Sequence, residues 1–517
     1  MSVTERPVTV EARHRGLVTA CLMSATLMQA LDQTIANVAL PYMQGSLSAT
    51  YNQMTWVLTS YVVMAAIMTA PVGWLSARYG RKNLFIVCLT GFTVASALCG
   101  LADSLVQIVL FRLLQGAFGA ALGPLAQATL LDIYPLAQRG KAMAVFSMGV
   151  MMGPIIGPTL GGYLTSDFSW RWVFYVNVPF GIATVLGLAA FMPRALPGAR
   201  SRFDWLGFSV LGVALATLQY ALDRGDQLDW LGSPVIVVCF ILAGLGFYLF
   251  IVHLTLARNT FVPRAVFADR NFIAGLVTIG SIGMVLISSS SLLAPYLENL
   301  SGYPVAEAGL VMAPRGFGTL LAMQIAGRIA NKVDPRLLLF TGFSLLTLAL
   351  YLQTGWTPDV SNFYLAATIT LQGFGLGLVY VPLQIVSFQT LAADLRTQGA
   401  AMLALVRSVM AAIGVSLTTW VLDRMTQYEH AVLNAAVTPF SRPLQAGGAV
   451  SSMLNPATHA GAAQLDAMVS SQASIIAYVD DFKFMMISTL PAFACLLLMR
   501  KPAKHQEMEM DELHVME

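Results

Sequence analysis

The chain has 517 residues, of which 57% are hydrophobic and only 11% are charged. A typical soluble domain carries about 25% charged residues, so the composition excludes a soluble globular enzyme, and a net charge of +3 is too small to indicate a nucleic-acid partner. The five cysteines lie in apolar runs without a CxxC pair and the six histidines form no metal-binding pair, so we expect no disulfide framework and no metal site.

Apolar segments long enough to cross a bilayer recur along the whole chain. A membrane-spanning helix needs about 20 apolar residues, and we assign fourteen segments: 16–40, 56–77, 83–102, 104–131, 142–166, 172–192, 205–222, 234–254, 272–297, 308–327, 337–355, 362–393, 399–422 and 484–499. Most contain no acidic or basic residue, while Asp32, Arg112, Arg315 and Arg407 each lie alone inside one of them. We therefore predict an all-α integral membrane protein with 14 transmembrane helices.

The loops between these segments differ in charge on the two sides of the membrane. The side that holds both chain ends collects most of the Lys and Arg residues outside the spans, whereas loop tryptophans such as Trp170 and Trp356 cluster on the other side. Because positively charged loops stay in the cytoplasm, we expect both termini to be cytoplasmic.

The spans divide the chain into six predicted regions. These are a cytoplasmic segment 1–15, an N-terminal six-helix half 16–193, two inserted helices 203–254, a C-terminal six-helix half 271–424 and 482–500, a periplasmic loop 425–481 and a cytoplasmic tail 501–517.

An internal repeat relates the two halves. The stretch 115-QGAFGAALGP-124 recurs loosely as 372-QGFGLGLVYVP-382, at the same separation as Arg139 and Arg396, and the loop 73–82 has a faint counterpart at 327–336. Parallel repeats of this kind are typical of transporters with a site at the repeat interface. We expect two pseudo-symmetric six-helix halves in a 6+2+6 arrangement; the alternative is chance similarity between glycine-rich helices.

Asp32 and Arg112 form the first candidate site. Both lie roughly 12 Å from the outer end of their helices, by the helical rise. An ionisable residue inside a membrane span is a functional candidate because an unpaired charge there is costly. A carboxyl group that gains and loses contact with a guanidinium can take up and release a proton. The alternative is a static structural ion pair.

Glycines recur every four residues in the fifth span, at Gly149, Gly153, Gly157 and Gly161, and Gly162 follows directly. The spacing predicts a flat helix face for close helix contact. Two prolines, Pro154 and Pro158, remove backbone donors and are expected to bend this helix. The alternative to a transport role is tight packing alone.

Five motifs together resemble the major facilitator superfamily, and within it the 14-span drug:proton antiporters of the EmrB/QacA type. They are 31-LDQTIANVALP-41, 73-GWLSARYGRK-82, 112-RLLQG-116, 149-GVMMGPIIGPTLGG-162 and 171-RWVFYVNVPFG-181. The stretch 222-LDRGDQLDW-230 and the long segment before the last span favour the EmrB type.

The resemblance implies the major facilitator fold and proton coupling at Asp32, supported by Arg112, with the glycine-rich fifth span as the antiporter motif. It also implies multidrug efflux across a bacterial inner membrane, driven by the proton gradient without a cofactor. By resemblance to the EmrB type, the segment 425–481 would contact a periplasmic membrane-fusion adaptor that leads to an outer-membrane channel; the alternative is a surface loop without a partner.

The cytoplasmic loop after the second span matches the family motif through Gly73, Arg78, Gly80, Arg81 and Lys82. In the family this loop stabilises one conformation. The acidic residue of the motif is replaced here by Ala77, so we expect Asp132 to pair with Arg78 or Arg81 instead. The alternative is that these basic residues only set the topology.

Polar residues inside the remaining spans are candidates for a substrate cavity: Gln115, Arg315, Gln372 and Gln384. With Arg112 and Arg407, the deep positions hold three arginines against the single acid Asp32. An excess of buried positive charge favours neutral or weakly acidic hydrophobic substrates over dications. The alternatives are that these arginines face lipid headgroups and that the glutamines only join helices.

We expect a proton-coupled exporter of hydrophobic drug-like molecules, surrounded by membrane lipid. The alternative is a permease of the same superfamily that imports or exports one specific metabolite without an adaptor. A receptor or scaffold fits less well because of the buried pair Asp32 and Arg112, and no set of catalytic residues indicates an enzyme.

Overall fold

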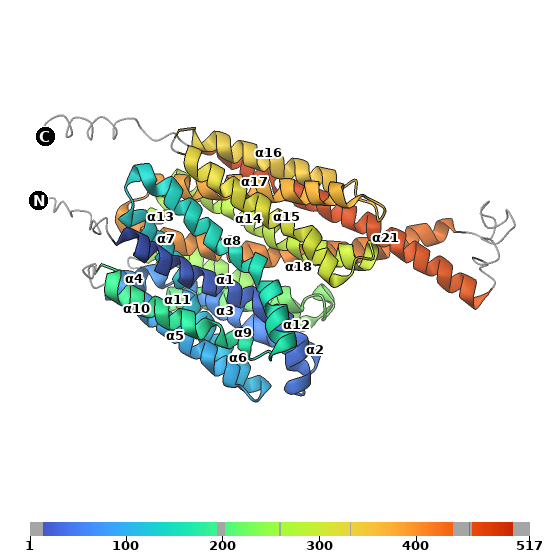
Figure 1. Ribbon diagram of the computed structural model, residues 1–517, viewed down its shortest axis with the longest axis horizontal. Helices are drawn as coiled ribbons and strands as arrows, with labels where there is room; N and C mark the ends of the chain where they lie inside the picture. The colour runs from blue at the N-terminus through green and yellow to red at the C-terminus, as the bar shows by residue number, and fades with distance from the viewer. Residues whose placement is uncertain are drawn as a thin grey trace, which may run out of the picture.

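The computed structural model describes residues 14–193, 202–257, 260–330, 332–437, 454 and 458–499, and these residues form helices joined by short turns (Figure 1). The predicted tail 501–517 and most of the predicted segment 1–15 lie outside the described residues. The N-terminal helices are α1 (Arg15–Ser46), α2 (Tyr51–Met54), α3 (Trp56–Thr69), α4 (Val72–Tyr79), α5 (Arg81–Leu101), α6 (Leu105–Gly119), α7 (Leu122–Ile133), α8 (Leu136–Asp167), α9 (Trp172–Tyr175) and α10 (Asn177–Phe191).

Two inserted helices and the C-terminal set follow. The inserted segment comprises α11 (Trp205–Arg224), η1 (Trp230–Gly232) and α12 (Pro234–Leu256). The C-terminal set comprises α13 (Ala265–Ala268), α14 (Arg270–Pro295), η2 (Tyr296–Leu300), α15 (Val305–Ile329), α16 (Pro335–Gln353), α17 (Asn362–Gln389), η3 (Ala393–Leu395), α18 (Arg396–Ala436), α21 (His459–Ser488) and α22 (Leu490–Leu498). The predicted all-α class is therefore confirmed.

Eleven helical segments of the described chain are long and apolar enough to cross a membrane, and the bent pair of α3 and α4 makes a twelfth. The helices α1, with 32 residues, and α15, with 25 residues, are long enough but do not meet the same measure of apolarity. These two helices carry Asp32 and Arg315. The count of 14 spans therefore stays a prediction.

The two halves pack in the same way around a pseudo-twofold axis. In the N-terminal half α1 packs on α8 and α3 on α6; in the C-terminal half α14 packs on α18 and α15 on α17. The Gln127 side-chain amide donates to the Gln384 side-chain carbonyl, and these residues lie 257 positions apart. A residue that contacts its own counterpart lies on the symmetry axis, so this contact supports the repeat.

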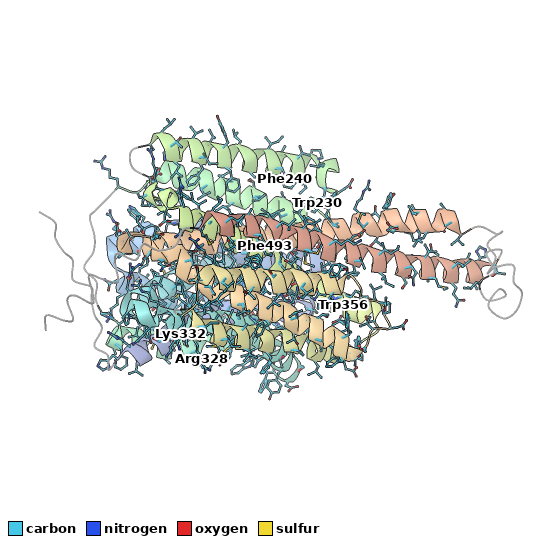
Figure 2. All side chains as sticks on the ribbon, turned by 90° about the horizontal axis from the view of Figure 1, so that it is seen from above. Trp230, Phe240, Arg328, Lys332, Trp356 and Phe493 are labelled. Carbon is cyan, nitrogen blue, oxygen red and sulfur yellow. The ribbon has the colours of Figure 1, made fainter. Side chains whose placement is uncertain are left out.

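The two ends of the bundle differ. We call the end with Arg81, Arg328 and Lys332 the basic end and the opposite end the aromatic end; Figure 2 labels Arg328 and Lys332 near one end and Trp230 and Trp356 toward the other. The halves meet at the basic end, where α4 packs on α18 and α8 on α15. A Cβ atom on Gly73 would overlap Gln398, and one on Gly327 would overlap Ala144, so small residues allow this close approach.

The described parts of the segment expected as the periplasmic loop 425–481 are largely helical, and residues 438–453 and 455–457 lie outside the described residues. Helix α18 continues to Ala436 and α21 starts at His459, and both project beyond the aromatic end (Figures 1 and 2). The two helices pack on each other, and His430 lies 3.0 Å from the Asp466 carboxylate across them. We refer to the projecting parts, 425–436 and 459–477, as the hairpin. Its Ala, Gln, Leu and Met residues have high helix propensity, which explains why helices form where a loop was expected.

Candidate functional site

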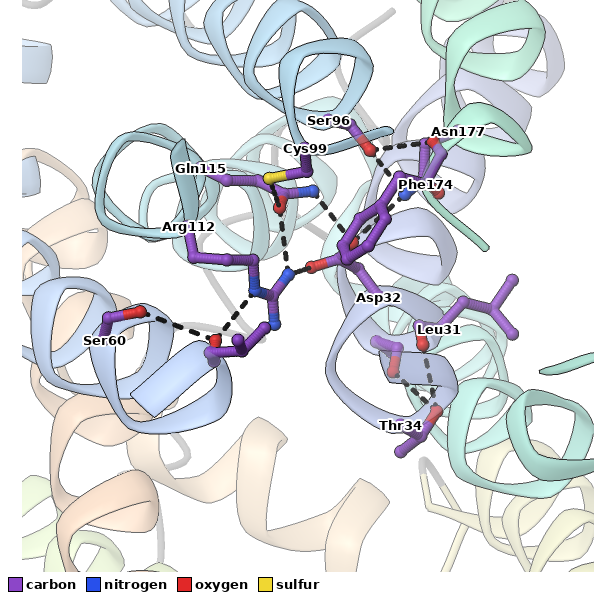
Figure 3. A network of polar contacts seen from close by, with 12 residues as sticks. Leu31, Asp32, Thr34, Ser60, Ser96, Cys99, Arg112, Gln115, Phe174 and Asn177 are labelled. Carbon is purple, nitrogen blue, oxygen red and sulfur yellow. Dashed lines mark hydrogen bonds and ion pairs between the residues drawn. The ribbon is translucent and has the colours of Figure 1, made fainter. Parts of the chain in front are cut away.

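Asp32 lies at the centre of a buried hydrogen-bond network in the N-terminal half (Figure 3). Arg112 Nη1 of α6 donates to Asp32 Oδ2 at 2.6 Å, and Gln115 Nε2, one turn later on the same helix, donates to Asp32 Oδ1 at 2.8 Å. Asn177 Nδ2 of α10 donates to Asp32 Oδ1 at 3.2 Å. The Asp32 side chain is 0% exposed and that of Arg112 is 1% exposed. The network thus compensates the charge of an acid that has no access to solvent here.

Further contacts fix the orientation of Arg112. Its Nε donates to the Val57 carbonyl at 3.1 Å and its Nη1 donates to Gln115 Oε1 at 2.9 Å. The guanidinium carbon lies 4.3 Å from the centre of the Tyr61 ring, a cation–π distance. A planar guanidinium with several fixed acceptors is held in one orientation, so a change in the Asp32 charge acts directly on α3 and α6.

Asn177 is a site residue that the sequence reasoning missed. Its amide contacts Asp32 and also donates to Ser96 Oγ at 3.1 Å, which links α10 and α5 to the acid. The signal was an amide side chain in the otherwise apolar start of a span, within a motif that we had quoted without giving this residue a role.

The glycine face of α8 packs directly on α1. Cβ atoms on Gly149, Gly153, Gly157 and Gly161 would each meet an α1 residue closer than ordinary contact distance, with Thr34 opposite Gly157. Thr34 Oγ1 also donates to the Gly153 carbonyl at 3.2 Å. The two prolines, Pro154 and Pro158, are exposed on another face of α8, and a Cβ on Gly162 would meet nothing within 4 Å. The helix that carries Asp32 is therefore packed closely against α8 along this face.

Asp132 joins the two halves at the basic end. It contacts Arg81 of the motif loop, and Arg396 Nη1 of α18 donates to its other oxygen at 2.6 Å. Gly80, directly before Arg81, has a φ of +81°, a conformation that favours glycine. The Arg78 guanidinium lies over the Trp74 ring, and Lys82 Nζ donates to the Ala189 and Met192 carbonyls at the end of α10.

The four residues expected in one substrate cavity lie in different places. Gln115 belongs to the Asp32 network, Gln384 contacts Gln127 between the halves, and Gln372 is buried with both amide atoms unpartnered among the described residues. Arg315 is 8% exposed. It donates to Leu286 O at 3.0 Å, Ser289 Oγ at 2.8 Å and Ser290 Oγ at 2.7 Å, all on α14. These contacts do not test whether the four residues line one cavity, so the shared cavity stays a prediction.

A cavity of about 420 Å³ lies beside the Asp32 network. Arg112 and Tyr61 form its inner wall, α11 and α18 contribute other walls, and Asp223 and Asp226 also line it. Asp223 accepts from Thr59 Oγ1 at 2.7 Å and from Gln219 Nε2 at 2.9 Å. The inserted helix α11 thus takes part in the cavity, which the 6+2+6 division did not anticipate.

The sequence predicts one acid and three arginines at deep positions. The structure adds two acids to this count, Asp223 and Asp481. Asp223 lines the cavity, and Asp481 of α21, which we had placed at the edge of a loop, is 0% exposed. Arg112 is compensated by Asp32, and Arg407 Nη1 donates to the Tyr380 hydroxyl at 2.9 Å. Arg315 keeps only uncharged hydrogen-bond partners among the described residues.

Comparisons with known proteins agree with this architecture. A model of the Major Facilitator Superfamily matches residues 22–415. The multidrug export protein EmrB of Escherichia coli (strain K12) is 34% identical over 439 residues, which are 84% of this chain and 86% of that protein. The fatty acid resistance protein FarB of Neisseria gonorrhoeae is 33% identical over 428 residues, which are 83% of this chain and 84% of that protein.

Solved structures with the same fold are more distant in sequence. The human organic anion transporter MFSD10 (TETRAN) superposes with a TM-score of 0.58 at 14% identity, covering 92% of this chain and 99% of that chain. The proton:xylose symporter XylE superposes with a TM-score of 0.57 at 14% identity, covering 92% of this chain and 96% of that chain. The chain therefore belongs to the major facilitator superfamily of transporters, and within it to the EmrB-like multidrug exporters.

Proposed function

We propose that this chain exports hydrophobic molecules in exchange for protons, and that Asp32 binds the coupling proton. The observation that carries the proposal is the fully buried Asp32 carboxylate held by Arg112, Gln115 and Asn177. Protonation of Asp32 removes its charge and leaves Arg112 without a counterion in a buried place, which costs several kcal/mol. A rearrangement that gives Arg112 new partners relieves that cost.

The packing around α1 connects protonation of Asp32 to the 420 Å³ cavity. The glycine face of α8 holds α1, and Arg112 is also a wall of the 420 Å³ cavity. A shift of Arg112 therefore changes the shape and charge of the cavity wall while α1 and α8 move as a unit. Exchange follows when substrate and proton favour different arrangements of these elements.

We propose neutral or weakly acidic hydrophobic substrates. Arg315 supports this because its buried charge has only neutral hydrogen-bond partners in the described chain, and the relative FarB is named for fatty acid resistance. The acids Asp223 and Asp226 at the 420 Å³ cavity act in the opposite direction. Strong protection against dicationic antiseptics, with none against weak acids, would contradict this part.

For its setting, we propose the inner membrane of a bacterium with both termini cytoplasmic. The hairpin that projects from the aromatic end then reaches into the periplasm and offers two helices to a membrane-fusion adaptor, which continues to an outer-membrane channel. A permease for one metabolite that acts without an adaptor remains the second candidate; export from cells with and without an adaptor separates the two.

The test of coupling is Asp32→Asn, which keeps the size of the side chain but cannot release a proton. Purified protein in lipid vesicles with a trapped pH-sensitive dye reports proton movement during transport of the neutral hydrophobic dye Nile red. We expect proton movement coupled to the dye to be lost in Asp32→Asn and kept in the control Asp167→Asn, whose carboxylate is exposed at the end of α8. Wild-type coupling in Asp32→Asn would overturn the assignment.

A further inference from the structure

The C-terminal half contains a group of buried polar side chains that have no hydrogen-bond partner among the described residues. They are both amide atoms of Gln353 and of Gln372, Nε1 of Trp356 and both carboxylate oxygens of Asp481. Three of these four side chains are 0% exposed and Trp356 is 1% exposed. Buried polar groups in proteins are almost always hydrogen-bonded, so four together indicate a site that binds something polar.

Packing brings Trp356 next to the turn of α21 that carries Asp481, and α16 and α17 pack on each other. The rings of Trp356 and Phe482, the residue after Asp481, lie 5.4 Å apart, and both Trp356 and Tyr478 pack on Tyr296, at 5.3 and 5.2 Å. On α16 and α17, Gly342 lies against Val379 and Gly375 against Leu346. This antiparallel register places Gln353 and Gln372 on neighbouring turns of the pair, about 6 Å apart along the axis.

This group is the symmetry counterpart of part of the Asp32 network. The 257-residue separation that pairs Gln127 with Gln384 also relates Gln115 to Gln372 and Ser96 to Gln353. The counterpart of Arg112 is Ile369. The C-terminal site therefore keeps the polar amides and lacks the guanidinium, and its acid comes from the last span.

The surroundings of Asp481 disfavour a negative charge. Asp423 of α18 and Asp480 of α21 lie close enough to repel it, and Lys483 is already engaged, with Nζ 2.9 Å from Asp480. The phenol of Tyr478 is a further titratable neighbour, and that of Tyr296 lies beside it. The packed elements α18 and η2 also carry the exposed Arg424 and the partly exposed Glu298. Helices α14 and α16, which also pack on α21, carry their charged residues, Arg270 and Arg336, at their opposite ends. A buried carboxylate without a hydrogen-bond partner among the described residues is costly, so the arrangement favours the neutral form of Asp481.

From this placement we infer that Asp481 is a second proton-binding residue, which serves the C-terminal half as Asp32 serves the N-terminal half. The inference rests on the proposed proton coupling. In the exchange step the O–H bond of the Asp481 carboxyl group breaks, the proton leaves on a water molecule, and the carboxylate remains; no oxidation or reduction occurs. The amides of Gln353 and Gln372 supply donors and acceptors for the water that carries this proton between the site and the interior of the bundle.

The first measurement reads the proton on Asp481 without any transport. Infrared spectra of the full-length protein in lipid nanodiscs at pH 7 should contain a carbonyl band of a protonated carboxyl group. We expect Asp481→Asn to lose this band, while Asp167→Asn, whose carboxylate is exposed at the end of α8, keeps it. A spectrum without such a band in the wild type, or one unchanged in Asp481→Asn, would overturn the inference.

The second measurement reads the role in exchange. In vesicles with Nile red as the probe, we expect Asp481→Asn to move one proton fewer per dye molecule than the wild type and Asp167→Asn to match the wild type. Asp481→Glu, which still titrates, should keep the wild-type ratio with a shifted pH dependence, and it serves where Asp481→Asn does not fold. If Asp481→Asn keeps the wild-type number of protons per dye molecule, or if Asp481→Glu keeps the wild-type pH dependence, the inference about Asp481 is overturned. If Asp32→Asn keeps proton coupling, the proposed function is overturned instead.

Discussion

Asp32 and Arg315 show how the partners of a buried charge decide its use. Asp32 has three donors from two other helices, so the carboxylate is stable while Arg112 stays in place. Arg315 donates to two serine hydroxyls and one backbone carbonyl. These partners satisfy its hydrogen bonds, but because they are uncharged they do not neutralise its positive charge. A charge that is bonded but uncompensated attracts an anionic ligand more strongly in a low-dielectric interior than in water.

Replacing Arg315 with Gln should therefore lower export of weak acids more than export of neutral compounds. The glutamine retains a donor for α14 but removes the charge, and we expect a difference of about fivefold, which corresponds to about 1 kcal/mol. Resistance of an efflux-deficient host to a fatty acid and to a neutral antibiotic measures it. Arg328→Gln, on the exposed basic end of the same helix, is the control; equal losses for both compounds would show that Arg315 is only structural.

Helix α8 acts at the scale of a whole element. Its glycine face fixes the distance to α1 over about three turns, while its prolines lie on an exposed face and weaken the helix without disturbing the contact. The counterpart helix α18 instead continues past the bundle into the hairpin. The two halves thus share packing but use their corresponding helices differently, one to close on α1 and one to extend from the membrane.

Gly157→Leu should abolish transport without preventing membrane insertion. The added side chain meets Thr34 of α1, and overpacking of this kind costs about 1–3 kcal/mol, while the leucine makes the span more apolar. The control is Gly162→Leu on the same helix, where a Cβ meets nothing within 4 Å. Dye efflux normalised to the inserted protein measures both; efflux of Gly157→Leu equal to that of Gly162→Leu would show that the glycine face is incidental.

At the scale of the whole molecule, contacts between the halves close the basic end. Asp132 bridges Arg81 of one half and Arg396 of the other, and Gln127 meets its counterpart Gln384 on the symmetry axis. Asp132 and its partners are partly exposed, so the bridge contributes modestly, as ion pairs near a surface do. A modest stabilisation is appropriate because the basic end must open and close in each transport cycle. Neither the closed nor the open form can then be much more stable than the other.

Asp132→Asn should shift the population toward a form open at the basic end. Loss of about 1 kcal/mol corresponds to about a fivefold change in the ratio of the two forms. Spin labels at Tyr79 of α4 and Leu337 of α16, both exposed, report the distance between the halves once the native cysteines are replaced. Asp103→Asn, which breaks the ion pair with Arg171 within one half, should leave the distances unchanged; a similar shift in both variants would contradict the proposed closure.

The sequence by itself determined the all-helical membrane class, the family and the positions of Asp32, Arg112 and the glycine face. These features are local, since apolar length and residue spacing along one helix are read directly from the chain. The internal repeat was also visible, because equivalent residues keep a constant separation.

Tertiary structure decided which side chains meet. Only packing brings Asn177 to Asp32, pairs Gln127 with Gln384 and gives Gln115 and Arg315 their separate hydrogen-bond partners. The sequence predicts Asp481 as the last residue of a loop because it precedes the last apolar run, yet α21 starts more than 20 residues earlier and packing buries the carboxyl group. Contacts between helices depend on their relative rotation and depth, and neither is fixed by the hydrophobic pattern of one span.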